Sequence, residues 1–258
     1  MDLLYLFTGL FSGALVGFSL GLIGGGGSIL AVPLMVYLVG VSEPHVAIGT
    51  SALAVAANAA LGLGGHARAG TVKWRIGLLY ACAGIIGAFL GSTAGKAFDG
   101  QKLLFLFAIV MILVGILMLR GCKAVGDAQA RLHRGNAPKV GAFGLGTGAF
   151  SGFFGIGGGF LIVPGLVAST RMAMLNAVGT SLVAVTAFGL TTALNYAWSG
   201  LVDWGLAAIF VAGGFLGSLA GTRAAKALSS KGQLTTVFAG LIFVVAAYML
   251  YQSGSAVF

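Results

Sequence analysis

Two glycine clusters interrupt apolar stretches of this sequence, and they match each other at a spacing of 131. Their members are Gly24, Gly25, Gly26, Gly27 and Ser28 in the first cluster and Gly155, Gly157, Gly158 and Gly159 in the second. Glycine breaks a helix because it loses the most backbone entropy on folding and readily adopts positive φ. Each cluster therefore predicts a helix, a break and a half-helix that starts near Ser28 or Gly159. Free N–H groups at such a start attract anions, and glycine lets a ligand approach the backbone.

Hydroxyl and amide side chains follow each cluster inside apolar segments, and the tripeptide Gly-Thr-Ser occurs at 49–51 and again at 179–181. The candidate ligand groups are Thr50, Ser51, Asn58, Thr180, Ser181 and Asn195. Serine and threonine in membrane helices often bond a carbonyl of the preceding turn, so backbone bonding and ligand contact are equal alternatives for the Gly-Thr-Ser pairs. Phe188 stands where Asn58 would repeat, so a helix–helix hydrogen bond is an alternative for Asn58.

The composition indicates a membrane protein. Charged residues make up 7% of the chain and hydrophobic residues 59%, whereas soluble domains are about one quarter charged. Several uncharged runs reach the roughly 18 residues that cross a bilayer. We expect an all-α polytopic protein of the cell inner (plasma) membrane. The net charge of +9 lies mostly between apolar runs, where it favours lipid headgroups and membrane topology over a nucleic-acid partner.

The motifs recur in the same order in both halves. Residues 72–74 match 202–204 at a spacing of 130, while the match of 87–92 to 213–218, at a spacing of 126, implies a small gap. We expect two tandem homologous membrane repeats, residues 1–120 and 140–258, joined by a basic loop over 121–139. Each repeat should contain a glycine-broken first helix and three spanning helices.

The positions of the basic residues predict the topology. If each glycine-broken run crosses the membrane once, the 14 Lys and Arg residues divide as eight against six. If each run is a hairpin, they divide as twelve against two, with Lys96 and Lys102 on the minority side. The positive-inside rule favours the hairpins. Both termini should then lie outside and the two repeats should be inverted. We also expect a basic loop from Gly64 to Arg75, which would contain His66.

The polar residues favour transport over catalysis, and we expect no catalytic residue, metal or cofactor. No Asp, Glu, Lys or Arg lies inside an apolar segment, so the buried relay typical of proton-coupled carriers is missing from the sequence. Cys82 and Cys122 form no C-x-x-C motif. A membrane thiol-redox relay built on these cysteines, or a non-transporting partner subunit or sensor, are the alternatives.

The repeated G-x-x-G-x-G-G element ending in Val-Pro, the Gly-Thr-Ser pairs and the G-x-F-L-G-S helix together resemble the sulfite exporter TauE/SafE family over nearly the whole chain. The resemblance implies a permease for sulfur-containing anions such as sulfite, thiosulfate or organosulfonates, with about eight membrane segments. The anion would bind at mid-membrane between the paired glycine breaks. The identity of the anion, its direction, a coupling ion and assembly into a homo-oligomer stay open.

Overall fold

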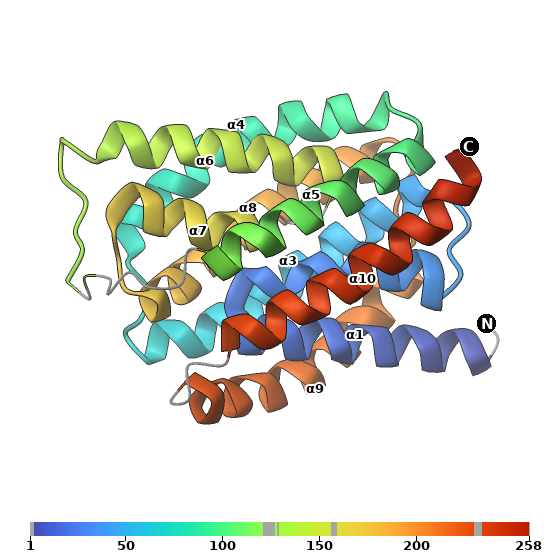
Figure 1. Ribbon diagram of the computed structural model, residues 1–258, viewed down its shortest axis with the longest axis horizontal. Helices are drawn as coiled ribbons and strands as arrows, with labels where there is room; N and C mark the ends of the chain where they lie inside the picture. Colours follow the sequence, from blue (N-terminus) through green and yellow to red (C-terminus); the bar gives the residue numbers. More distant parts are fainter. Residues whose placement is uncertain (1–2, 121–126, 128, 156–158, 230–233, 258) are drawn as a thin grey trace.

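The computed structural model describes residues 3–120, 127, 129–155, 159–229 and 234–257, and this part of the chain is helical (Figure 1). The α-helices are α1 (Leu3–Ile23), α2 (Ala31–Pro33), α3 (Pro44–Arg68), α4 (Trp74–Lys96), α5 (Gly100–Arg120), α6 (Ala137–Phe154), α7 (Gly159–Thr170), α8 (Met174–Trp198), α9 (Trp204–Ser229) and α10 (Leu234–Val257). Between α1 and α3 lie a 3-10 turn, η1 (Gly24–Leu30), and a π-helical turn, η2 (Leu34–Leu38).

Within the described residues, five helices are long and apolar enough to cross a bilayer, namely α1, α3, α4, α8 and α9. Their outward faces carry large apolar side chains such as Phe7, Leu78 and Leu194, which are more than half exposed. Apolar faces of this size suit lipid, and helices satisfy their own backbone hydrogen bonds there. The chain is therefore a multi-pass helical membrane protein.

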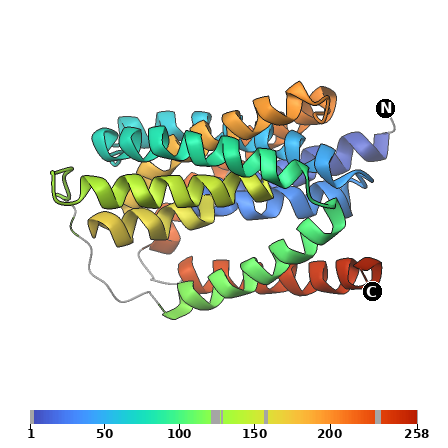
Figure 2. The ribbon, with the colours of Figure 1, turned by 90° about the horizontal axis from the view of Figure 1, so that it is seen from above.

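The chain doubles back at each glycine cluster. Figure 1 shows the segment after α1 lying alongside α1, and α7 lying alongside α6, and both pairs are in contact. The start of α1 and the end of α10 lie at the same end of the molecule in Figures 1 and 2. The turn from α3 to α4 and the start of α6 lie at the other end.

Helices from the two halves pack on each other through glycines. Helix α1 lies along α9, and α6 lies along α4. A Cβ added at Gly17 would overlap the backbone of Gly214, and a Cβ at Gly148 would overlap that of Gly84. Gly148 follows Gly17 at a spacing of 131, and Gly214 follows Gly84 at a spacing of 130. Such glycine faces bring helix backbones close together in lipid.

Three further pairs of contacts keep these spacings, so α4 and α9 align at a spacing of 130 without a gap. Gly87 contacts the backbone of Leu145, and its equivalent Gly217 contacts that of Ala14. Gly91 contacts the backbone of Ala149, and its equivalent Gly221 contacts that of Phe18. Gly144 meets Tyr80 where Gly13 meets Phe210. The sequence match at a spacing of 126 therefore pairs residues that lie one helical turn away from those that make equivalent packing contacts.

Helices α5 and α10 pair with each other and form a separate layer in Figure 2. Phe107 of α5 joins this layer to the glycine-broken segments, because its ring lies 5.6 Å from that of Phe154 and 6.4 Å from that of Phe160. Tyr37, at the end of the first broken segment, packs edge-on against Tyr248 of α10 at 5.4 Å. The outer layer thus braces both broken segments.

Two local predictions were wrong. Helix α3 continues through Gly64 and Gly65 to Arg68, because the Ala69 N–H still bonds the Gly65 carbonyl and the chain leaves the helix only at Gly70, with φ of +69°. The first half-helix is not a regular helix from Ser28, since η1 spans Gly24–Leu30 and α2 is three residues long. The prediction for the second half-helix is confirmed, because α7 begins at Gly159.

Candidate functional site

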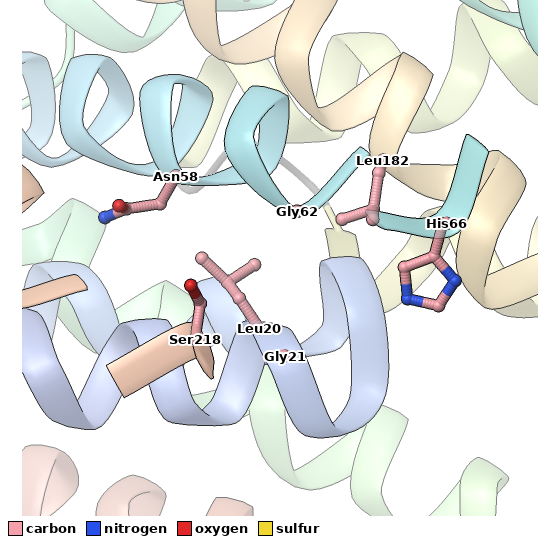
Figure 3. A pocket seen from close by; sticks show the side chains of 7 residues that line it. All are labelled: Leu20, Gly21, Asn58, Gly62, His66, Leu182 and Ser218. Atoms are coloured by element: carbon pink, nitrogen blue, oxygen red, sulfur yellow. The ribbon is translucent and has the colours of Figure 1, made fainter. Parts of the chain in front are cut away.

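A small pocket with both apolar and polar lining residues lies where α1, α3, α8 and α9 meet (Figure 3). Its volume is about 10 Å³, which is the room that one water molecule needs. Both halves of the chain contribute to it, and α1 reaches it just before the first glycine cluster. Its lining consists of Leu20, Gly21, Asn58, Gly62, His66, Leu182 and Ser218.

Asn58 is the most unusual residue of this pocket. It is 1% exposed, and neither its amide nitrogen nor its amide oxygen has a hydrogen-bond partner among the described residues. Gly214 of α9 makes room for this amide, since a Cβ there would overlap it. A buried amide without partners costs free energy, so this position indicates a ligand or water that supplies them. The alternative of a helix–helix hydrogen bond for Asn58 is not realised among these residues.

His66 lines the same pocket from the last turn of α3 (Figure 3). Thr71 donates its hydroxyl proton to the His66 carbonyl at 3.1 Å, so its oxygen accepts from Nδ1 of the ring at 3.0 Å. The neutral ring then carries its proton on Nδ1, and Nε2 is left as a hydrogen-bond acceptor. Sequence reasoning placed His66 in a loop and missed it. Its spacing of four residues from Gly62 and eight from Asn58 puts all three on one helix face and was the available signal.

The two threonines of the Gly-Thr-Ser motifs connect the halves. The Thr50 hydroxyl accepts the backbone N–H of Asp203 at 2.9 Å, and the Thr180 hydroxyl accepts that of Lys73 at 2.9 Å. Asp203 and Lys73 precede α9 and α4, so each motif holds the start of a helix from the other half. Both threonines are fully buried. Their hydroxyls accept hydrogen bonds from the starts of other helices. The sequence had suggested either a bond to the preceding turn or contact with a ligand.

The serines and glycines of these motifs also have defined neighbours. Ser51 donates to the Ile48 carbonyl at 3.0 Å and Ser181 to the Val178 carbonyl at 2.7 Å, which is the backbone bonding that the sequence left open. A Cβ at Gly49 would press on Tyr196, and one at Gly179 would press on Thr71 and His66. The glycine of each motif therefore admits a large polar residue of the other half.

Asn195 lies outside the pocket, in the contact between α8 and α4. Its side-chain oxygen accepts from Nζ of Lys96 at 2.8 Å, and its side-chain nitrogen donates to the Ser92 hydroxyl at 2.6 Å. Lys96 Nζ also donates to the Asn195 backbone oxygen at 3.0 Å and to the Ser199 hydroxyl at 2.8 Å. The amide thus fixes a lysine at the end of α4.

The first glycine cluster lies in η1, which contacts both α7, the helix that contains Gly159, and α8. Gly27 lies against the backbone of Ser19 and Leu20, where no Cβ would fit. Gly155 ends α6 with φ of +68°, a conformation that favours glycine. Gly157 and Gly158 lie outside the described residues. Gly24, Gly25 and Gly26 belong to η1, whose 3-10 backbone continues through Ser28, a fully buried residue.

A second pocket opens at the end of the molecule opposite the termini, between the α3–α4 turn and the segment before α6. Its volume is about 400 Å³ and its charged lining residues are Lys73, Arg75 and Arg131. Three cations around one opening raise the local concentration of anions. Cys82 is exposed on α4 and unpaired, and Cys122 lies outside the described residues.

Comparisons with known proteins agree with this architecture. The family model described as "Sulfite exporter TauE/SafE" matches residues 9–249. A probable membrane transporter protein of Xylella fastidiosa strain 9a5c is 53% identical over 244 residues, which cover 94% of each chain. The probable membrane transporter protein YunE of Bacillus subtilis is 25% identical over 90% of this chain and 92% of its own. No solved structure is significantly similar. The chain belongs to the TauE/SafE family of membrane transporters.

Proposed function

We propose that the chain is a permease that moves sulfur-containing anions, such as sulfite, thiosulfate or organosulfonates, across the membrane. The observation that carries this proposal is the unpartnered, buried Asn58 amide, which lies in a pocket beside the first glycine break. The description of its family as sulfite exporters supports the substrate class. Oxygen atoms on sulfur would accept from the amide nitrogen and from backbone N–H groups of the breaks.

We further propose that the two halves are inverted repeats. The glycine contacts between α1 and α9 recur between α6 and α4 at a constant spacing. The start of α1 and the start of α6 lie at opposite ends of the molecule in Figure 1, as expected for repeats that are inverted in the membrane. The turns at the end of α3 and before α6 carry Arg68, Lys73 and Arg131, so that end is the cytoplasmic one by the positive-inside rule.

In this proposal the anion binds at the junction of the two breaks. Backbone N–H groups of residues 24–28 and of Gly159 form the cradle, and Thr50, Ser51, Thr180 and Ser181 frame it. The threonines accept backbone N–H groups, so each hydroxyl retains its own proton to donate. Asn195 is bonded to Lys96 and Ser92 and acts through Lys96.

The volume of the pocket implies that transport needs a conformational change. A space of about 10 Å³ is too small for a sulfite ion, so the described state is closed around the site. An inside-negative potential contributes about 2.3 kcal/mol per charge per 100 mV toward anion exit. Export therefore requires no buried proton relay.

The test is transport of radiolabelled sulfite, thiosulfate and methanesulfonate into proteoliposomes with an imposed potential, while sodium and proton gradients are varied separately. We expect a flux of at least one of these anions that follows the potential. Protein-free liposomes give the baseline. The absence of flux for all three anions under every gradient would overturn the substrate assignment.

A further inference from the structure

The spacing that relates the two halves pairs the pocket around Asn58 with a second set of residues. Leu20 corresponds to Ser151 at a spacing of 131, and Gly62 and His66 correspond to Thr192 and Tyr196 at a spacing of 130. The same spacing relates the structural contacts, because Gly179 faces His66 where Gly49 faces Tyr196. The second set therefore occupies the equivalent place between α6 and α8.

These equivalents carry three buried hydroxyl groups without partners. Ser151 is 1% exposed, and Thr192 and Tyr196 are fully buried. None of their oxygens has a hydrogen-bond partner within the described residues. Thr192 and Tyr196 lie one turn apart on the same face of α8, and α6, which carries Ser151, contacts α8. Buried hydroxyls are nearly always paired in proteins, so three on two contacting helices indicate that something else supplies the partners.

The surroundings of this cluster favour a negatively charged ligand. Lys96 Nζ lies 5.8 Å from the centre of the Tyr196 ring. Neutral hydroxyls donate to oxyanions, and a nearby ammonium group disfavours a second cation.

The two sites lie toward opposite ends of the helix bundle. His66 is in the last turn of α3, which ends far from the termini, while Tyr196 is near the end of α8, on the side where α10 ends (Figure 1). A permease must load and release its substrate on opposite sides. A pair of equivalent polar sites, one toward each side, provides this.

We propose that Ser151, Thr192 and Tyr196 form a second binding station for the transported oxyanion, toward the end of the membrane where the termini lie. The inference rests on the proposed function and extends it, since the Asn58 pocket is then the station nearer the opposite end. The anion exchanges the hydroxyl donors of one station for the amide of the other.

The test uses three variants that remove a hydroxyl and little else, namely Ser151→Ala, Thr192→Val and Tyr196→Phe. Sulfite affinity is measured by ligand-induced thermal shift on the purified protein, and flux by proteoliposome assay from each side separately. We expect each variant to fold as well as the wild type and to lose about tenfold in apparent sulfite affinity, because a hydrogen bond to a charged group is lost. The loss in flux should be larger when sulfite is supplied on the side of the termini.

Ser12→Ala is the matched control, because Ser12 also carries a buried, unpartnered hydroxyl but corresponds to Phe143 and to no residue of the station. We expect its sulfite affinity to equal that of the wild type. If the wild type transports sulfite and all three variants keep its affinity and flux, the second station is wrong. The proposed permease function would still hold, and the hydroxyls would bind only an ordered water. Wild-type protein that neither binds nor transports any of the three anions would overturn the proposed function itself.

Discussion

The surroundings of Asn58 and of its equivalent, Phe188, share their glycine contacts and differ in their side chains. In the first half, the Asn58 amide faces Gly214 of α9 and has no partner among the described residues. In the second half, the Phe188 ring faces Gly84 of α4 and lies 6.3 Å from the ring of Tyr80. Equivalent glycines thus admit an amide on one side and an aromatic ring on the other.

The frame around these two positions is nearly identical. Thr50 and Thr180 hold equivalent helix starts at the same distance of 2.9 Å. The comparison shows that recurring contacts fix where side chains project, while the identity of each side chain decides which polar groups the site offers. Recurring contacts therefore do not imply identical binding chemistry.

The largest expected effect comes from inserting side chains into the close glycine contacts that α1 makes with α9 and that α6 makes with α4. Gly217→Val and Gly87→Val would drive side chains into the backbones of Ala14 and Leu145. We expect each to cost about 3 kcal/mol or more through overpacking, and to abolish a monodisperse peak in fluorescence-detected size-exclusion chromatography. Gly64→Ala is the control, because a Cβ there meets no atom within 4 Å. Normal peaks for both valine variants would show that the helix contacts are wrong.

The second prediction removes the difference between position 58 and its equivalent, Phe188. Asn58→Phe copies the second half, where Gly84 accommodates Phe188 as Gly214 accommodates Asn58. We expect the variant to fold and its anion flux to fall about 100-fold, because a contact to a charged group is lost and the pocket is filled. Leu61→Phe, on the exposed face of the same helix, should transport normally. Equal flux in the two variants would contradict the assignment of the pocket.

The third prediction tests the shared frame. Thr50→Val and Thr180→Val leave the N–H groups of Asp203 and Lys73 without an acceptor, so each should lower the free energy of unfolding by about 1–2 kcal/mol. Thr186→Val is the control on α8, because its hydroxyl bonds only the Leu182 carbonyl of its own helix. Urea or thermal unfolding in detergent measures the difference. Costs no greater than that of the control would mean that these bonds do not secure the frame.

The smallest expected effect is a gain in stability. Asn58→Leu replaces a buried amide without partners by an apolar group of similar size, so it should raise the free energy of unfolding by about 1 kcal/mol. The thermal midpoint in detergent, compared with that of the wild type without ligand, measures it. A destabilised Asn58→Leu would indicate that the amide has partners in the unliganded protein.

Much of the frame follows from the sequence, because glycine spacing and hydropathy determine helix contacts directly. The two glycine breaks and the start of α7 near Gly159 were predicted. The gap inferred from the match of 87–92 to 213–218 was wrong, because a local likeness of glycine and phenylalanine does not fix which turn meets the partner helix.

The candidate site was less predictable than the frame. Asn58 was recognised, but Ser218 was not, because its contribution depends on how α9 crosses α1 and α3. His66 was assigned to a basic loop from Gly64 to Arg75, whereas α3 continues to Arg68. The bonding of Thr50 and Thr180 to the opposite half requires contacts between distant parts of the chain. Periodicity in a single sequence contains no information about such contacts.

Binding of radiolabelled sulfite, thiosulfate and methanesulfonate to purified wild-type protein and Asn58→Leu tests the central claim most directly. We predict saturable binding of at least one anion to the wild type, and a loss of about tenfold or more in affinity for Asn58→Leu despite its equal or higher thermal stability. Equal affinity in both proteins would contradict the claim that the unpartnered amide of Asn58 is an anion contact.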